Sequence, residues 1–226
     1  MQHRLVAIGP AWLRPAPVVY LSAAAWLALV VLMLTGSGGV IRHDRLLAGG
    51  PPLWLATITF VAGWQVMVWA MMAPASLHAL QHAGARFIAG YVAVWTAFGV
   101  AMFLGDACLH YAVSHWSWLG AHAWLIPGST LIAVGTYQLS KLKARSLEAC
   151  LTAPRSGVRH GLDCVGSSGG LMLLTFALAT ASLPAMAVIT LLMIYEVSPF
   201  GQSTVRVLGY ALIGLGVLVL YGPIPL

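Results

Sequence analysis

The chain has 226 residues, of which 60% are apolar and only 7% are charged. A soluble domain of this length carries roughly a quarter charged residues, so an ordinary soluble domain is excluded and most of the surface faces something other than water, for which lipid is the simplest candidate. The net charge of +6 comes from only 11 lysines and arginines, which lie mainly in short loops beside apolar runs. That distribution is typical of membrane topology signals, and we expect no nucleic-acid partner.

Six long apolar runs define the expected fold. Each is close to the ~20 residues that a helix needs to cross a bilayer, and runs that are apolar on all sides favour helices over barrel strands. We therefore predict an all-α, polytopic membrane protein with about six transmembrane helices. Residues 1–17, which contain three prolines, are expected to form an interfacial segment ahead of a single transmembrane domain over 18–226. The runs cover about residues 18–34, 53–77, 87–113, 123–139, 169–194 and 205–221.

The basic residues predict how these spans are oriented. Six spans place both termini on one side, and that side carries eight of the 11 lysines and arginines. Five of these, Lys143 among them, lie in the loop after the fourth run. By the positive-inside rule both termini are cytoplasmic. Glu196, just beyond the fifth run, is then expected on the periplasmic side.

Soft metal ligands gather on the predicted cytoplasmic side. On a helix Met71 shares a stripe with the histidines that follow it, and the loop after the fourth run adds cysteines. Thioether, thiolate and imidazole together suit Cu(I), or Zn(II) if methionine is a bystander. Core packing of the methionine and a plain structural role for the loop residues are the alternatives. This cytoplasmic group consists of Met71, His78, His82, Cys150, His160 and Cys164.

A second group of candidate ligands lies at the predicted periplasmic side. Asp106 and His110 are four residues apart and share a helix face, and His122 follows in a short loop. A carboxylate with two imidazoles suits Zn, Cu(II) or Fe. In the alternative interpretation Asp106 lies at the headgroup level and pairs with His110 alone. We refer to these three residues as the periplasmic group.

Other cofactors and catalytic machinery are not indicated. The sequence contains no phosphate-binding loop, dinucleotide fingerprint or nucleophile elbow, so no nucleotide cofactor is expected. Heme is not expected either, because His110 is the only histidine placed within a span as an axial ligand. No catalytic residue can be named. The sequence leaves enzymatic activity open and favours a protein that is not a stand-alone enzyme.

Several motifs resemble a known family. The segment from Trp64 to Ser76, W-x-x-M-x-x-A-M-M-x-P-x-S, resembles the hallmark of a bacterial family described as predicted metal-binding integral membrane proteins. His160 to Gly166 is similar to its H-G-x-x-C-x-G stretch. Where the family pattern continues with a cysteine pair, this chain has Ser167 and Ser168. The resemblance implies a multi-pass protein of the bacterial inner membrane that binds metal, with fewer sulfur ligands here than the pattern contains.

These observations lead to a ranked set of functions. The first is binding of a transition metal, with copper expected first and zinc second, in metal handling or as a subunit of a larger membrane metalloenzyme. Copper is preferred because the order of the periplasmic group is similar to a copper site in the third subunit of copper-dependent membrane monooxygenases. The alternatives are a metal-free structural or accessory subunit, and a transporter or channel. The expected partners are the lipid bilayer and other membrane subunits or further copies of the chain.

Overall fold

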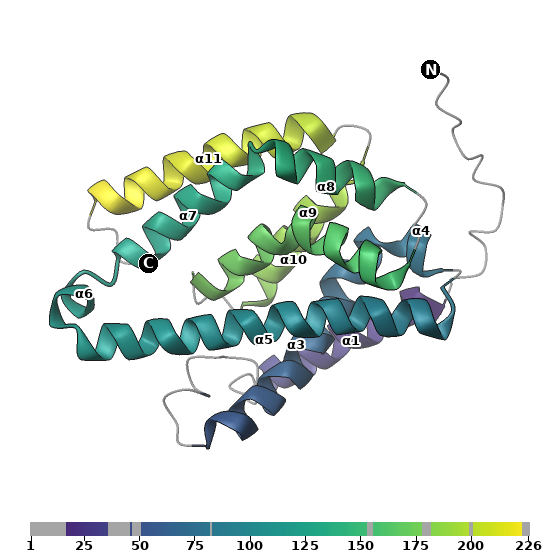
Figure 1. The fold of residues 1–226 in the computed structure, drawn as a ribbon, viewed down its shortest axis with the longest axis horizontal. Helices are drawn as coiled ribbons and strands as arrows, with labels where there is room; N and C mark the ends of the chain where they lie inside the picture. The colour runs from purple at the N-terminus through teal and green to yellow at the C-terminus, as the bar shows by residue number, and fades with distance from the viewer. Residues whose placement is uncertain are drawn as a thin grey trace.

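The computed structural model describes residues 17–35, 46, 51–81, 83–152, 156–177, 182–198 and 201–222. These residues form helices joined by short connections, with no strand among them (Figure 1). The predicted all-α class is confirmed. The predicted interfacial segment falls almost wholly on residues 1–16, outside the described residues. The helices are α1 (Pro17–Leu34), α3 (Leu53–Ala75), α4 (Leu77–Leu80), α5 (Ala85–His115), α6 (Ser117–Ala121), α7 (Leu125–Gln138), α8 (Lys141–Leu151), α9 (Gly157–Ala177), α10 (Leu183–Glu196) and α11 (Gly201–Tyr221).

Four helices in the described part of the chain are long and apolar enough to cross a membrane. They are α1, α3, α5 and residues 203–221 of α11. Helix α10 is apolar but has only 14 residues, and α7 also has 14. The composition and length of the four long helices fit a membrane protein. The predicted number of six spans is not established by these four.

The predicted fifth span over residues 169–194 is wrong as a single helix. Helix α9 begins at Gly157 and ends at Ala177, and a separate helix α10 begins at Leu183. The side chain of Ser182 caps α10 by accepting a hydrogen bond from the Ala185 amide at 3.4 Å, and Pro184 lies in the first turn. Serine at the cap with proline two residues later, in the first turn, is a strong helix start, and it outweighs the apolar composition that suggested one helix.

Two hydrogen bonds link α1 to α3 at the backbone carbonyl that Pro74 leaves without a partner. Proline has no amide hydrogen, so the carbonyl of Ala70, one turn earlier, loses its partner within the helix. Two side chains of α1 replace it: Ser22 Oγ donates to this carbonyl at 3.2 Å and Trp26 Nε1 at 2.9 Å. Inside a membrane an unpaired carbonyl is costly, so these two bonds stabilise the last turns of α3 and hold them against α1.

Helices α5 and α9 pack closely because glycines line their contact. A Cβ at Gly90 would lie 2.9 Å from the Val158 amide nitrogen, and one at Gly161 would lie 3.0 Å from Cβ of Val94. Only glycine allows such an approach. The close packing places the first two turns of α9 against the first two turns of α5, where the candidate site lies.

Candidate functional site

Two cysteines from different helices meet in the interior. Cys150 of α8 and Cys164 of α9 form a side-chain hydrogen bond and are 3% and 1% exposed. The Sγ atom of Cys164 also lies 3.5 Å from Oγ of Ser76 and 3.6 Å from the hydroxyl of Tyr91. The α3–α4 junction, α5, α8 and α9 thus converge on one pair of thiols. We call Cys150 and Cys164 the thiol pair.

The two thiols differ in acidity. The pKa of Cys164 is lowered to about 7, because Cys150 donates a hydrogen bond to its sulfur and the hydroxyls of Ser76 and Tyr91 do the same, while burial opposes the shift. The pKa of Cys150 is raised by its hydrogen bond to Cys164 and by burial. Above a pKa of about 7 the thiol pair therefore holds one proton, on Cys150, and one negative charge, on Cys164.

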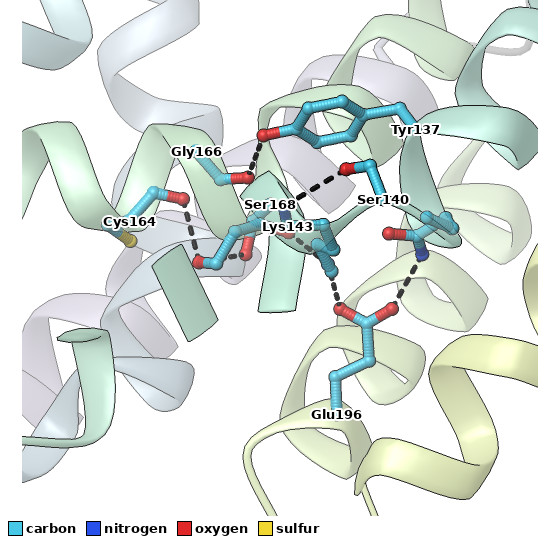
Figure 2. A network of polar contacts seen from close by, with 9 residues as sticks. Tyr137, Ser140, Lys143, Cys164, Gly166, Ser168 and Glu196 are labelled. Carbon is cyan, nitrogen blue, oxygen red and sulfur yellow. Dashed lines mark hydrogen bonds and ion pairs between the residues drawn. The ribbon is translucent and has the colours of Figure 1, made fainter. Parts of the chain in front are cut away.

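A buried cation lies beside the thiol pair. Lys143 of α8 is fully buried, its Nζ is 2.6 Å from Oε2 of Glu196, and it donates to the carbonyl of Ser167. Figure 2 shows this network, in which Gln138 Nε2 also donates to Oε1 of Glu196 at 2.7 Å. Burial lowers the pKa of Lys143, and the carboxylate of Glu196 and the two thiols act against that shift. The thiols therefore lie within the electrostatic influence of an ammonium group.

The sequence prediction for Glu196 is corrected by this network. Glu196 was expected on the side of the membrane opposite to Lys143, yet the two form an ion pair. The physical reason is the break before α10. Because α10 starts anew after α9 (Figure 1), the chain can turn back there, and the last residue of α10 pairs with Lys143 in the first turn of α8.

An aromatic cage surrounds His160, which lies one helical turn before Cys164. The centre of its ring is 5.8 Å from that of Phe87, 5.9 Å from that of Tyr91 and 6.1 Å from that of His78. His160 is 2% exposed, and no described residue forms a hydrogen bond with its Nε2 atom. Burial and the neighbouring His78 lower the pKa of His160. Its imidazole is therefore neutral at physiological pH, the form that binds metals.

The structure brings much of the cytoplasmic group together. Cys150 and Cys164 touch, and His160 lies beside both Tyr91 and His78. Met71 is fully buried in the core, and His82 lies outside the described residues. Within the described part of the chain, no three His, Cys, Asp or Glu side chains are grouped closely enough to hold one metal ion. The metal role of each residue stays a prediction.

The periplasmic group is less compact. Nδ1 of His110 is 3.4 Å from Oδ2 of Asp106 and 3.0 Å from its carbonyl oxygen. His122 stacks on Trp118 with ring centres 4.6 Å apart, and its Nδ1 is 2.7 Å from the Trp118 carbonyl. Asp106 and His110 pair as the alternative interpretation expects, while His122 contacts Trp118 of the helix that precedes it, α6. A metal at this group also remains a prediction.

Sequence reasoning assigned no role to the side chains that surround the thiol pair. Ser76 and Tyr91 lie in segments that resemble the metal-binding family. Their contact with Cys164, which is far away in the sequence, produces no local sequence pattern. Lys143 is predicted from the sequence as one of the positive loop charges and lies in a further segment that resembles the same family, but neither observation indicates its burial. Its burial could have been suspected from its place between Leu142 and Leu147 in an amphipathic helix, since Lys143, Leu147 and Cys150 share the buried face of α8.

The fold and the site define the class of this protein: an all-helical protein with membrane-length apolar helices and a buried thiol pair. Its family follows from comparison with known sequences. The chain belongs to the PpoB2 family, described as copper chaperones, whose pattern matches residues 61–219. The matched range contains the thiol pair, His160, Lys143 and Glu196. No match was found among curated proteins or solved structures. Family membership confirms a metal-related protein and indicates copper-related metal handling.

Proposed function

We propose that this protein carries copper as Cu(I) on the thiol pair of Cys150 and Cys164. The observation that carries the proposal is the buried contact between these two thiols, one of which has a lowered pKa. Thiolates are soft ligands that favour Cu(I). A structural zinc site takes four protein ligands, whereas Cu(I) is stable with two thiolates. Membership in a family described as copper chaperones supports the same metal.

The charge balance around the thiol pair supports this assignment. Binding of Cu(I) by two thiolates leaves one net negative charge, which is costly to bury without a counterion. Lys143 supplies a buried positive charge beside the sulfurs, and Glu196 with Gln138 holds it in place. Each of these three residues is at most 2% exposed. The Lys143–Glu196 pair is neutral as a whole, and the attraction between its ammonium group and the thiols offsets part of the cost of burying the negative charge of the complex.

The proposal includes a revised topology in the bacterial inner membrane. Because Glu196 at the end of α10 pairs with Lys143 of α8, α9 and α10 together form a return pair that starts and ends on one side. Helix α11 runs antiparallel to α7, since Gly209 lies against Gly135 and Gly216 against Gly128. With the N-terminus and the basic loop in the cytoplasm, the end of α11 then faces the periplasm. In this arrangement the thiol pair lies toward the cytoplasmic side.

The partners follow from a carrier role. A copper carrier needs a donor and an acceptor, and we propose that the acceptor is another protein at the membrane, either a metalloenzyme subunit or a second copy of this chain. The thiol pair is closed to solvent in this structure. Delivery of copper therefore needs α8 to separate from α9, since each of these two helices contributes one sulfur.

Copper stoichiometry tests the proposal. The protein is purified in mild detergent under reducing, oxygen-free conditions, loaded with Cu(I), and analysed by inductively coupled plasma mass spectrometry. We expect about one copper per chain, and its loss in Cys150→Ser and Cys164→Ser. Cys108→Ser is the matched control, since Cys108 is an exposed cysteine on α5 and its removal should leave the copper content unchanged.

Two outcomes would overturn the assignment. A full copper content that persists when both thiols are removed would place the metal elsewhere, with the periplasmic group as the next candidate. Absence of copper in the native protein, together with a fixed set of co-purifying chains, would instead identify a metal-free accessory subunit.

A further inference from the structure

His160 carries a nitrogen atom that the described fold does not satisfy. Its Nε2 is buried and has no hydrogen-bond partner among the described residues, although its ring is held from three sides by Phe87, Tyr91 and His78. A buried polar atom without a partner costs about 1–3 kcal/mol, so such atoms are rare and call for an explanation. An imidazole nitrogen with a free lone pair is also a ligand for a soft or borderline metal.

His78 gives this buried imidazole a route to the surface. It lies on α4 and is exposed, and its ring centre is 6.1 Å from that of His160, with the ring planes at 85°. With a metal–nitrogen bond of about 2 Å, two imidazoles that bind one ion from opposite sides have ring centres about 6 Å apart. The separation of the two ring centres matches that distance.

The same two residues lead directly to the thiol pair. His160 lies one helical turn before Cys164 on α9, so both side chains are on the same face. Tyr91 connects them: its ring stacks on His160 at 5.9 Å, and its hydroxyl is 3.6 Å from Sγ of Cys164. An exposed imidazole, a buried imidazole and a buried thiol pair thus follow one another from the surface inward.

We propose that His78 and His160 form a second Cu(I) site, through which copper is loaded onto the thiol pair. This inference rests on the proposed function of Cys150 and Cys164. Copper stays Cu(I) throughout: two copper–nitrogen bonds break as two copper–sulfur bonds form. The proton that Cys150 gives up passes to a freed imidazole and, through the exposed His78, to water. Imidazoles bind Cu(I) less tightly than thiolates, so transfer runs inward.

Loading kinetics test the inference. Copper is offered as the coloured Cu(I)–bicinchoninate complex, and the loss of its absorbance on mixing with the detergent-solubilised full-length protein gives the rate. We expect His78→Leu and His160→Leu to load about tenfold more slowly or worse, and to reach the same final copper content. Leucine at position 160 removes a nitrogen that has no partner, so the fold should tolerate it. His115→Leu, at an exposed histidine on the far end of α5, is the matched control and should load at the native rate.

Equilibrium binding to variants without the thiols provides a second readout. In Cys150→Ser/Cys164→Ser the imidazole pair should retain weak Cu(I) binding, and the further change His160→Leu should abolish it. Native loading rates in both histidine variants, or no weak site in the thiol-free protein, would overturn the inference and leave the thiol site standing. Full copper content in the thiol-free protein would instead overturn the proposed function, so the two failures are distinguishable.

Discussion

Cys164 is the residue on which the proposed chemistry depends. Its sulfur lies next to the thiol of Cys150 and the hydroxyls of Ser76 and Tyr91, which stabilise a thiolate in an interior that would otherwise favour the neutral thiol. Both cysteines are recognisable in the sequence as candidate metal ligands, but their contact is not. Residues 150 and 164 are joined through a change of helix direction, and no periodicity relates one helix face to the other.

The acidity of the thiol pair predicts how copper affinity depends on pH. Above a pKa of about 7 only Cys150 loses a proton when copper binds, because Cys164 is already a thiolate. Below it both lose one. As the pH is lowered, the affinity for Cu(I) should therefore fall about tenfold per pH unit above pH 7 and about a hundredfold per unit below it. Competition titrations against a Cu(I) chelator across neutral pH measure the two slopes, and an affinity that does not vary with pH would contradict the account.

Lys143 provides a test of the buried charges. Lys143→Met leaves the carboxylate of Glu196 buried without its cation, so the free energy of unfolding should drop by about 3–5 kcal/mol. Lys143→Met/Glu196→Gln removes both charges and should recover most of that loss. Unfolding in detergent with increasing dodecyl sulfate measures the change. Lys141→Met, at an exposed position in the same helix, is the control. A double variant as unstable as the single one would argue against the ion pair as the cause.

At the scale of helices, glycines determine which elements can touch. Gly128 and Gly135 on α7 face Gly216 and Gly209 on α11, each pair seven residues apart. A Cβ at Gly216 would lie 2.8 Å from the carbonyl of Gly128, and one at Gly135 would lie 2.7 Å from the carbonyl of Gly209. Helices in membranes associate through such small residues. The contact secures α7 and thereby the position from which α8 begins, one residue after Ser140.

Alanine substitutions at two glycines of α11 distinguish the effect of close helix packing from the effect of helix propensity. Gly216→Ala should lower the free energy of unfolding by about 1–3 kcal/mol, because the new methyl group overlaps the α7 backbone. Gly214→Ala, in the same helix, meets no atom within 4 Å and should be neutral or slightly stabilising, since alanine favours a helix over glycine. Thermal unfolding of both variants in detergent decides the matter. Equal effects would mean that α7 and α11 do not pack as described.

At the scale of the whole molecule, sequence patterns predicted helices and their apolar character but not every turn of the chain. Four of the predicted spans correspond to long apolar helices, because apolar length is a property of the local sequence. The fifth predicted span was wrong. The helix start at Ser182–Pro184 lies inside a long apolar stretch, and the apolar length of that stretch suggested a single helix. That single break moves Glu196 to the side of Lys143, which no local pattern could indicate.

The return pair of α9 and α10 predicts where the chain ends. A six-span arrangement places the C-terminus in the cytoplasm, whereas the topology proposed from the antiparallel pairing of α7 with α11 and the Lys143–Glu196 ion pair predicts a periplasmic C-terminus. Alkaline phosphatase, which is active only in the periplasm, should be active when fused after residue 226. Fusion at Ser140, between α7 and α8, is the control and should be inactive. The reverse result would restore the six-span topology.

Copper K-edge X-ray absorption of the Cu(I)-loaded protein tests the central claim most directly, because it reports the elements bonded to the metal. If the thiol pair of Cys150 and Cys164 holds copper, the spectrum should show a low-coordinate Cu(I) whose nearest neighbours are sulfur atoms, and Cys164→Ser should remove that sulfur signal. A first shell made only of nitrogen or oxygen, or a spectrum unchanged by Cys164→Ser, would contradict the assignment.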